Sequence, residues 1–254
     1  MLFTLKRVAA ACIAVLVMAP LAQAGGYRLL NLDGSLVKWG APQFGAGASI
    51  SYAFAMSAMR FDKARNCAGL VPLDGLAAHS HVTQQQIRQE ADAAFAAWAK
   101  VTGLRFSLTT DIAKADILIG AQAKPVGRAF TNIELDTAEQ VEKAMAGPAI
   151  KTAPPKKPEA LRAIRQALIC LNPDQPWKIG FDGRLGVYDL RYTLMHEIGH
   201  AIGLDHPGAT GALMGFRYDE KRSGLAPADI EAARKLYGTR DLTVSQSLSS
   251  SARH

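Results

Sequence analysis

Apolar residues recur at intervals of three and four between residues 83 and 101, which is the period of one buried helix face. Thr83 and Gln86 have the spacing of a capping box at the start of a helix, and Gly103 follows its end. The pattern predicts a helix over 83–101 that packs its apolar side, Phe95 and Trp98 included, into a core.

Short apolar or alternating runs predict five strands. They lie at 50–54, 104–108, 116–119, 127–133 and 169–172. The segments around them have less regular patterns. We expect an extended N-terminal arm at 25–48, a loop at 60–82 and a surface insertion, helical in parts, at about 134–168.

Two more helices are expected in the second half of the chain. Asp189 is a candidate cap for a helix that runs to Ile202. Pro227 in a first turn and Gly238 just past the end bracket a last helix. The serine-rich residues 239–254 are predicted to form a disordered tail.

The first 24 residues have the pattern of an export sequence. Lys6 and Arg7 precede a short apolar run at 8–19, and Ala22-Gln23-Ala24 has the small-x-small form of a cleavage site. This predicts a signal peptide at 1–24, cut near Ala24, and a secreted or periplasmic protein. The alternative is a membrane anchor, but the apolar run is short for a bilayer span, so stable membrane insertion is not predicted.

The net charge of the mature chain excludes few classes of function. Without Lys6 and Arg7 the formal charge falls from +7 to +5, and it is spread along the chain with no nucleic-acid motif. We therefore expect no nucleic-acid partner. A mildly basic surface would favour anionic surfaces, and an exported protein that binds cell-wall polymers stays open as one functional hypothesis.

Residues 196–206 carry the most specific pattern, H-E-x-x-H-x-x-G-x-x-H. His196 and His200 are one helical turn apart and lie on one face. Gly203 can adopt a left-handed conformation that ends the helix and brings His206 back as a third ligand. Three imidazoles leave a fourth position open on Zn²⁺, which is typical of a catalytic site.

Glu197 is the candidate catalytic residue at this site. Zinc would acidify a water and polarise a peptide carbonyl, and Glu197 would take the proton and pass it to the leaving amine. A zinc site retained without catalysis is the alternative. Asp205 is either a support for the metal ligands or a solvated charge.

The sequence around this motif resembles a known family. The long zinc motif followed by a methionine, here Met214, resembles the pattern of the metzincins. Within the metzincins, the chain is most similar to the matrixins, the matrix metalloproteinase type. The similar segments are Ala93–Phe106 ("AF..W..VT.L.F"), Ala115–Ile119 ("ADI.I"), Ala212–Tyr218 ("ALM.P.Y") and Leu225–Gly238 with its "LYG" end. The resemblance covers about residues 50–238 and leaves 134–168 unmatched. The compact leader favours a bacterial source.

The resemblance implies an α/β catalytic domain at 49–238. It implies a twisted, mostly parallel sheet with one antiparallel edge strand, two long helices and a C-terminal helix. A peptide or protein substrate would bind beside the edge strand at 127–133. Met214 would pack under the zinc histidines without coordinating, and Phe216 and Tyr218 would wall the S1′ pocket. The implied activity is that of a monomeric zinc endopeptidase; a catalytically weak zinc-dependent peptide- or matrix-binding protein is the alternative.

The chain departs from the matrixin pattern near the site. Phe216 replaces the usual proline, which predicts a differently shaped pocket, and it also stands where some metzincins have a tyrosine ligand. Pro207 replaces the usual serine. The sequence does not support a structural zinc or calcium site, because the His-x-Asp pattern of such sites is not found. His79 and His81 are close together but precede the first helix, and they are expected in a surface loop.

Cys67 and Cys170 would remain in the exported chain, and an even pair predicts one disulfide. Two buried thiols are one alternative. Cys67 as an inhibitory zinc ligand is another, although the residues around it lack the cysteine-switch pattern.

Overall fold

The computed structural model describes residues 26–136, 160–208 and 211–240. The predicted signal peptide, the middle of the predicted insertion and nearly all of the predicted tail lie outside the described residues. No helix in the described part is long and apolar enough to cross a membrane.

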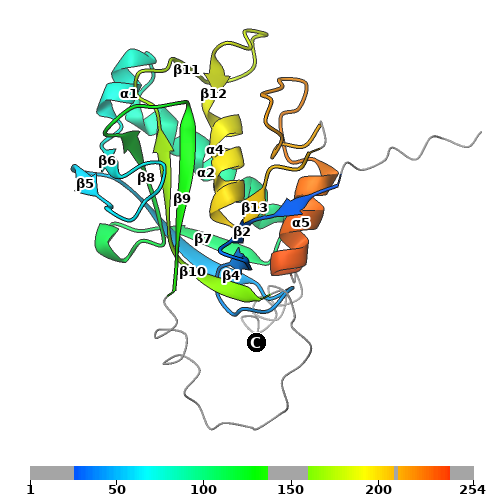
Figure 1. Cartoon of the computed structure of the whole chain (residues 1–254). Helices are drawn as coiled ribbons and strands as arrows, with labels where there is room; N and C mark the ends of the chain where they lie inside the picture. The colour runs from blue at the N-terminus through cyan, green and yellow to red at the C-terminus, as the bar shows by residue number, and fades with distance from the viewer. Residues whose placement is uncertain (1–25, 137–159, 209–210, 241–254) are drawn as a thin grey trace, which may run out of the picture.

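A mainly parallel sheet organises the described residues (Figure 1). Its main path runs β2 (Asn31–Leu32), β3 (Ser35–Lys38), β10 (Leu161–Leu171), β8 (Ile117–Gln122), β4 (Ala48–Phe54) and β7 (Leu104–Leu108). Strands β7, β4, β8 and β10 pair in parallel. Strand β9 (Ala129–Leu135) pairs antiparallel with β10 and has no second partner strand in the described part of the chain. The predicted α/β architecture with an antiparallel edge strand is confirmed.

The sheet has more antiparallel pairs than the one we expected. Strand β6 (Gly69–Val71) pairs antiparallel with β8 and with β5 (Met59–Arg60), and β2 pairs antiparallel with β3. The prediction that 60–82 is only a loop is therefore wrong, since this stretch also contains α1 (Asp74–His79). These elements are too short to produce a recognisable apolar period.

The two long helices begin and end close to the predicted residues. Helix α2 (Gln84–Val101) starts with the capping box, in which Gln86 N donates to Thr83 Oγ1 over 3.1 Å. Helix α4 (Leu190–Ala201) is capped by Asp189, which accepts from Tyr192 N over 2.7 Å. The helices pack together, and Trp98 Nε1 donates to Met195 O across their interface over 2.9 Å.

The last helix, α5 (Pro227–Tyr237), begins at the expected proline. Gly238 follows it with φ +67°, a left-handed value that favours glycine. Figure 1 shows α5 beside β13, the short strand that follows α4.

The predicted insertion at 134–168 is too long, because residues 161–171 form one strand. Ile164, Ala167 and Leu168 of β10 are buried, whereas Arg165 forms an ion pair with Glu134 on the neighbouring β9. The alanine-rich, charged composition favours a helix, but this segment forms a strand because it pairs with β9 and with β3 and β8. The predicted short strand at 169–172 is the end of β10.

The expected N-terminal arm is part of the folded unit. Strand β1 (Arg28–Leu29) pairs antiparallel with β13 (Leu204–Asp205), and β3 pairs in parallel with the start of β10. The boundary expected at residue 49 therefore does not separate the arm from the sheet. Two remaining short strands, β11 (Trp177–Lys178) and β12 (Tyr188–Asp189), pair in parallel, and β12 leads directly into α4.

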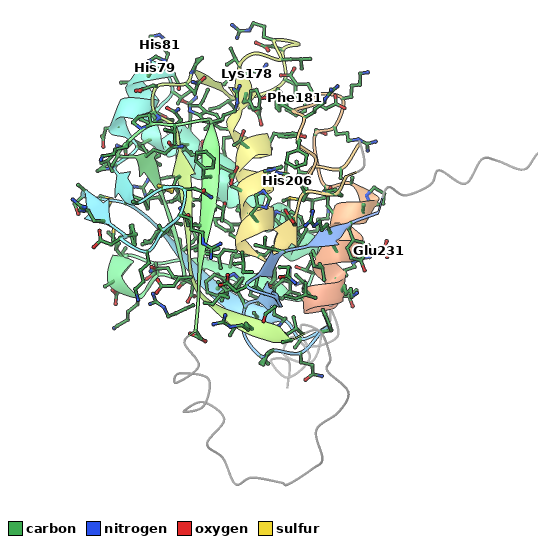
Figure 2. All side chains as sticks on the ribbon, in the orientation of Figure 1. His79, His81, Lys178, Phe181, His206 and Glu231 are labelled. Atoms are coloured by element: carbon green, nitrogen blue, oxygen red, sulfur yellow. A yellow bond between two sulfur atoms is a disulfide. The ribbon has the colours of Figure 1, made fainter. Side chains whose placement is uncertain are left out.

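A disulfide joins Cys67, in the segment between β5 and β6, to Cys170 in β10. His79 and His81 are exposed at the end of α1, and Figure 2 shows both far from His206. His79 lies in a helix and not in the expected loop, because residues 74–79 form a short helix with apolar Leu76 and Ala77 buried.

Candidate metal centre

Three histidines converge beside helix α4. His196 and His200 occupy successive turns of α4, and His206 follows β13. One ring nitrogen of each lies within 4.8 Å of the others, and among the described residues this is the group of three or more ligand-type side chains that could hold a metal ion. His196 Nε2 and His206 Nε2 are 3.1 Å apart.

Backbone carbonyls orient two of the rings. His196 Nδ1 lies 2.8 Å from Leu213 O, and His200 Nδ1 lies 2.9 Å from Leu204 O. A ring that donates from Nδ1 leaves Nε2 as the lone-pair donor for a metal. A donor set of three imidazole nitrogens fits Zn²⁺.

Gly203 makes the turn that returns His206 to the helix. Its φ is +96°, and a Cβ there would lie 2.2 Å from Val37 O of strand β3. Gly203 O also accepts from Leu30 N over 2.8 Å. The predicted left-handed turn is confirmed. Glycine is also required at this position because strand β3 lies too close for any side chain.

The third histidine is held by its own neighbours. Asp205 Oδ1 accepts from His206 N over 2.8 Å, and Asp205 Oδ2 pairs with Arg28 Nε of β1 over 3.0 Å. Phe216 stacks on the His206 ring with centroids 4.0 Å apart, although its side chain is 78% exposed. Asp205 is therefore more than a solvated charge, since it links the third histidine to the N-terminal segment.

Burial keeps two of the imidazoles neutral. It lowers the pKa of His200 to about 3, with a further decrease from His196. It lowers the pKa of His206 to about 4, again with His196 contributing and Asp205 opposing. Neutral rings at physiological pH are the form that binds a cation.

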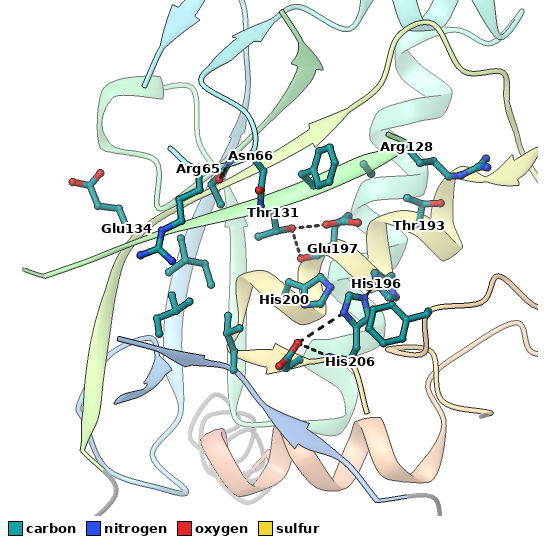
Figure 3. A pocket seen from close by; sticks show the side chains of 18 of the residues that line it. Arg65, Asn66, Arg128, Thr131, Glu134, Thr193, His196, Glu197, His200 and His206 are labelled. Carbon is teal, nitrogen blue, oxygen red and sulfur yellow. Dashed lines mark hydrogen bonds and ion pairs between the residues drawn. The ribbon is translucent and has the colours of Figure 1, made fainter. Parts of the chain in front are cut away.

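Glu197 points from α4 toward the edge strand and is buried. Its Oε2 lies 2.7 Å from Thr131 Oγ1, which also lies 2.9 Å from Glu197 O (Figure 3). Burial raises the pKa of Glu197, while the charge of His196 and the bond from Thr131 oppose this effect. The carboxylate is thus a stronger base than an exposed glutamate.

Met214 lies directly beneath the histidine-bearing turn of α4. A Cβ on Gly199 would lie 2.2 Å from Met214 Sδ, so only glycine allows this approach. The turn is anchored by Asp229 of α5, whose carboxylate accepts from Leu213 N over 2.8 Å and from Met214 N over 3.2 Å. Leu213 O in turn is hydrogen-bonded to His196 Nδ1. Because Asp229 of α5 holds Leu213, helix α5 indirectly orients the first histidine.

The histidines and Glu197 line a cavity of about 770 Å³ that follows β9. Figure 3 shows Arg65 and Glu134 at one end and Arg128 and Thr193 at the other. Phe216 and Tyr218 also line the cavity, and their role as a wall of the S1′ pocket stays a prediction. Tyr218 is fixed there, because its hydroxyl donates to Glu220 Oε1 over 2.8 Å.

Thr131 and Asp229 were not identified as site residues from the sequence. Asp229 stands three residues after Ala226, a spacing that signals a helix start, but its bonds to the Met214 turn depend on tertiary packing. Thr131 belongs to a predicted strand with no motif around it. Neither residue is recognisable from spacing alone.

Comparison with known proteins gives a consistent result. The family model described as Matrixin matches residues 76–238. The chain is 29% identical over 163 residues to Metalloendoproteinase 5-MMP of Arabidopsis thaliana, which covers 60% of this chain and 40% of that protein. It is 30% identical over 166 residues to Stromelysin-3 of Rattus norvegicus, which covers 64% of this chain and 29% of that protein. The chain thus spans less than half the length of these curated relatives.

Proposed function

The chain belongs to the matrixin family, and on that premise we propose that it is a zinc-dependent endopeptidase. His196, His200 and His206 hold one ion, and Glu197 is the general base. The observation that carries the proposal is the convergence of three imidazoles beside a buried carboxylate in one cavity.

Zn²⁺ bound at this site would act as a Lewis acid that polarises a peptide carbonyl and acidifies water. Glu197 takes the proton of the attacking water and delivers it to the leaving amine. Thr131 holds the carboxylate at 2.7 Å and so limits its rotation between these two steps. Leu213 O and Leu204 O keep the histidine rings in place.

The substrate binds in extended form along β9. The edge of β9 away from β10 has no partner strand in the described ranges, and residues of β9 line the cavity. Backbone groups on a free edge pair with an added strand and give affinity without sequence preference. Side chains of the substrate would then reach the cavity walls, where Phe216 and Tyr218 influence specificity.

We place this activity outside the cytoplasm. The support is the leader pattern at 1–24 and the disulfide between Cys67 and Cys170, which is typical of oxidising compartments. The protein acts as a monomer on peptides or proteins.

The test is a cleavage profile of the zinc-loaded protein on a proteome-derived peptide library, read by mass spectrometry. We expect new termini that disappear after chelation and return after one equivalent of zinc is added. Stoichiometric zinc with no cleaved peptide would contradict the proposal and favour a zinc-dependent peptide-binding protein. Cleavage that survives complete zinc removal would also contradict it.

A further inference from the structure

A cationic side chain in the cavity has a buried atom without a partner. Arg128 immediately precedes β9 and lines the cavity. Its Nη1 is buried and has no hydrogen-bond partner within the described residues. Buried polar atoms in native proteins are almost always hydrogen-bonded, so Arg128, a residue that lines the cavity, carries an unmet donor.

The guanidinium is held in place by an aromatic stack. Its central carbon lies 3.2 Å from the centroid of the Tyr188 ring, and Tyr188 stacks on Tyr218 with centroids 4.3 Å apart. Tyr218 is fixed in turn by hydrogen bonds with Asp189 N and Glu220. The charge is therefore positioned before any ligand arrives, which lowers the entropy lost on binding.

The acids around the stack are already committed. Asp189 accepts from Tyr192 N and Gly180 N, each over 2.7 Å. Asp182 and Glu220 both form ion pairs with Lys178. Arg128 forms no ion pair with any described residue, so its charge is available to a ligand.

The position of Arg128 along the cavity indicates which side of the scissile peptide bond it would contact. The hydroxyl of Thr131 contacts the carboxylate of Glu197. Arg128 precedes Thr131 by three residues, which span about 10 Å in an extended chain. Antiparallel pairing is the more stable arrangement for an added strand. A peptide paired antiparallel with β9 places residues that follow the scissile bond near the start of β9. Figure 3 shows Arg128 at this end of the cavity, beyond Glu197 and His196.

We propose that Arg128 binds a carboxylate of the substrate on the C-terminal side of the scissile bond. The inference rests on the proposed endopeptidase function and names part of its substrate class. The carboxylate comes from an aspartate or glutamate side chain, or from a free C-terminus close to the cleaved bond. Both sources offer two oxygens that match the planar guanidinium.

Two matched peptide pairs distinguish these sources. One pair is amidated at its C-terminus and carries Glu or Gln at one of the three positions after the scissile bond. The other pair has no acidic side chain and ends, within the same distance, in a free acid or an amide. We expect the zinc-loaded full chain to prefer the carboxylate member of at least one pair by about tenfold in kcat/KM.

Variants assign the preference to Arg128. Arg128→Gln should lose it while still cleaving the neutral peptide, and Arg128→Glu should prefer Lys over Gln at the same position. Arg88→Gln is the matched control, because Arg88 also lies over an aromatic ring, 4.6 Å from the centroid of Phe54, but outside the cavity. It should keep the full preference.

Equal kcat/KM values for both members of both pairs in the parent protein would overturn the proposal, even if the variants fail to fold. A preference that survives in Arg128→Gln would also overturn it. Failure of the endopeptidase function is separable, because fluorescence anisotropy with the zinc-loaded Glu197→Ala protein measures affinity for the same peptides. If no peptide is cleaved, an affinity ratio of about tenfold supports the role of Arg128, and a ratio near one rejects it.

Discussion

The hydroxyl of Thr131 on edge strand β9 lies 2.7 Å from Oε2 of Glu197 on helix α4. This contact joins the strand along which we place the substrate to the residue that we propose as the base. The same hydroxyl lies 2.9 Å from Glu197 O, so Thr131 fixes both the side chain and its helical turn relative to β9.

Thr131→Val should lower kcat about tenfold with little change in KM, because the isosteric variant removes the hydroxyl and leaves the strand intact. Steady-state kinetics on one cleaved peptide, with bound zinc quantified in the same samples, measures the effect. Thr131→Ser keeps the hydroxyl and should recover most of the activity. An unchanged kcat in the valine variant would show that the contact does not assist Glu197.

Gly203→Ala should lower the free energy of unfolding by about 3 kcal/mol or more. The new Cβ would lie 2.2 Å from Val37 O, and φ is +96°. Gly34→Ala is the matched control, because φ is +82° there but no atom lies within 4 Å of an added Cβ. It should cost about 1 kcal/mol. Equal losses in denaturant titrations of the two variants would mean that contact with β3 does not require glycine at 203.

Replacing both Cys67 and Cys170 by serine should reduce the free energy of unfolding by about 4 kcal/mol. The bridge closes a loop across a sequence separation of 103 residues and so restricts the unfolded chain. Urea unfolding of the parent, the double variant and the reduced parent tests this. Reduction should reproduce most of the loss, whereas identical stabilities of oxidised and reduced parent would favour the alternative of two buried thiols.

Stability should depend on pH through Lys38, which is fully buried and donates to Trp39 O and Ala41 O. Burial lowers its pKa to about 8, compared with about 10.4 in an unfolded chain. Between these values the unfolded state binds more protons than the native state, so stability rises with pH by up to about 1.4 kcal/mol per unit.

The measurement for Lys38 is the free energy of unfolding from pH 7 to 10.5 in the parent and in Lys38→Met. The parent should gain stability relative to the variant above pH 8, because only the parent carries the titrating group. A difference between the two proteins that stays constant over this range would contradict the lowered pKa.

What the sequence predicted well depends on residues that are near one another along the chain. The caps at Thr83 and Asp189, the helical spacing of His196 and His200, and the turn at Gly203 each involve a few successive residues. Local geometry determines these features, and apolar period and turn chemistry reveal them.

The sequence predicted poorly what depends on pairing between distant segments. Strand β10 was missed over residues 161–168, because its alanines and arginines favour helix until β9 and β8 pair with it. The contact of Thr131 with Glu197 joins residues 66 apart, and the hydrogen bond that Asp229 accepts from Leu213 N depends on where α5 packs. No spacing rule encodes such contacts.

The central claim is that Glu197 transfers the proton at a zinc held by His196, His200 and His206. The most direct measurement is kcat/KM of the Glu197→Gln protein beside the parent, each loaded with zinc and each with its metal content determined. The account predicts one zinc per chain in both proteins and a loss of at least about a thousandfold in kcat/KM for the variant. Equal zinc content with kcat/KM close to that of the parent would contradict it.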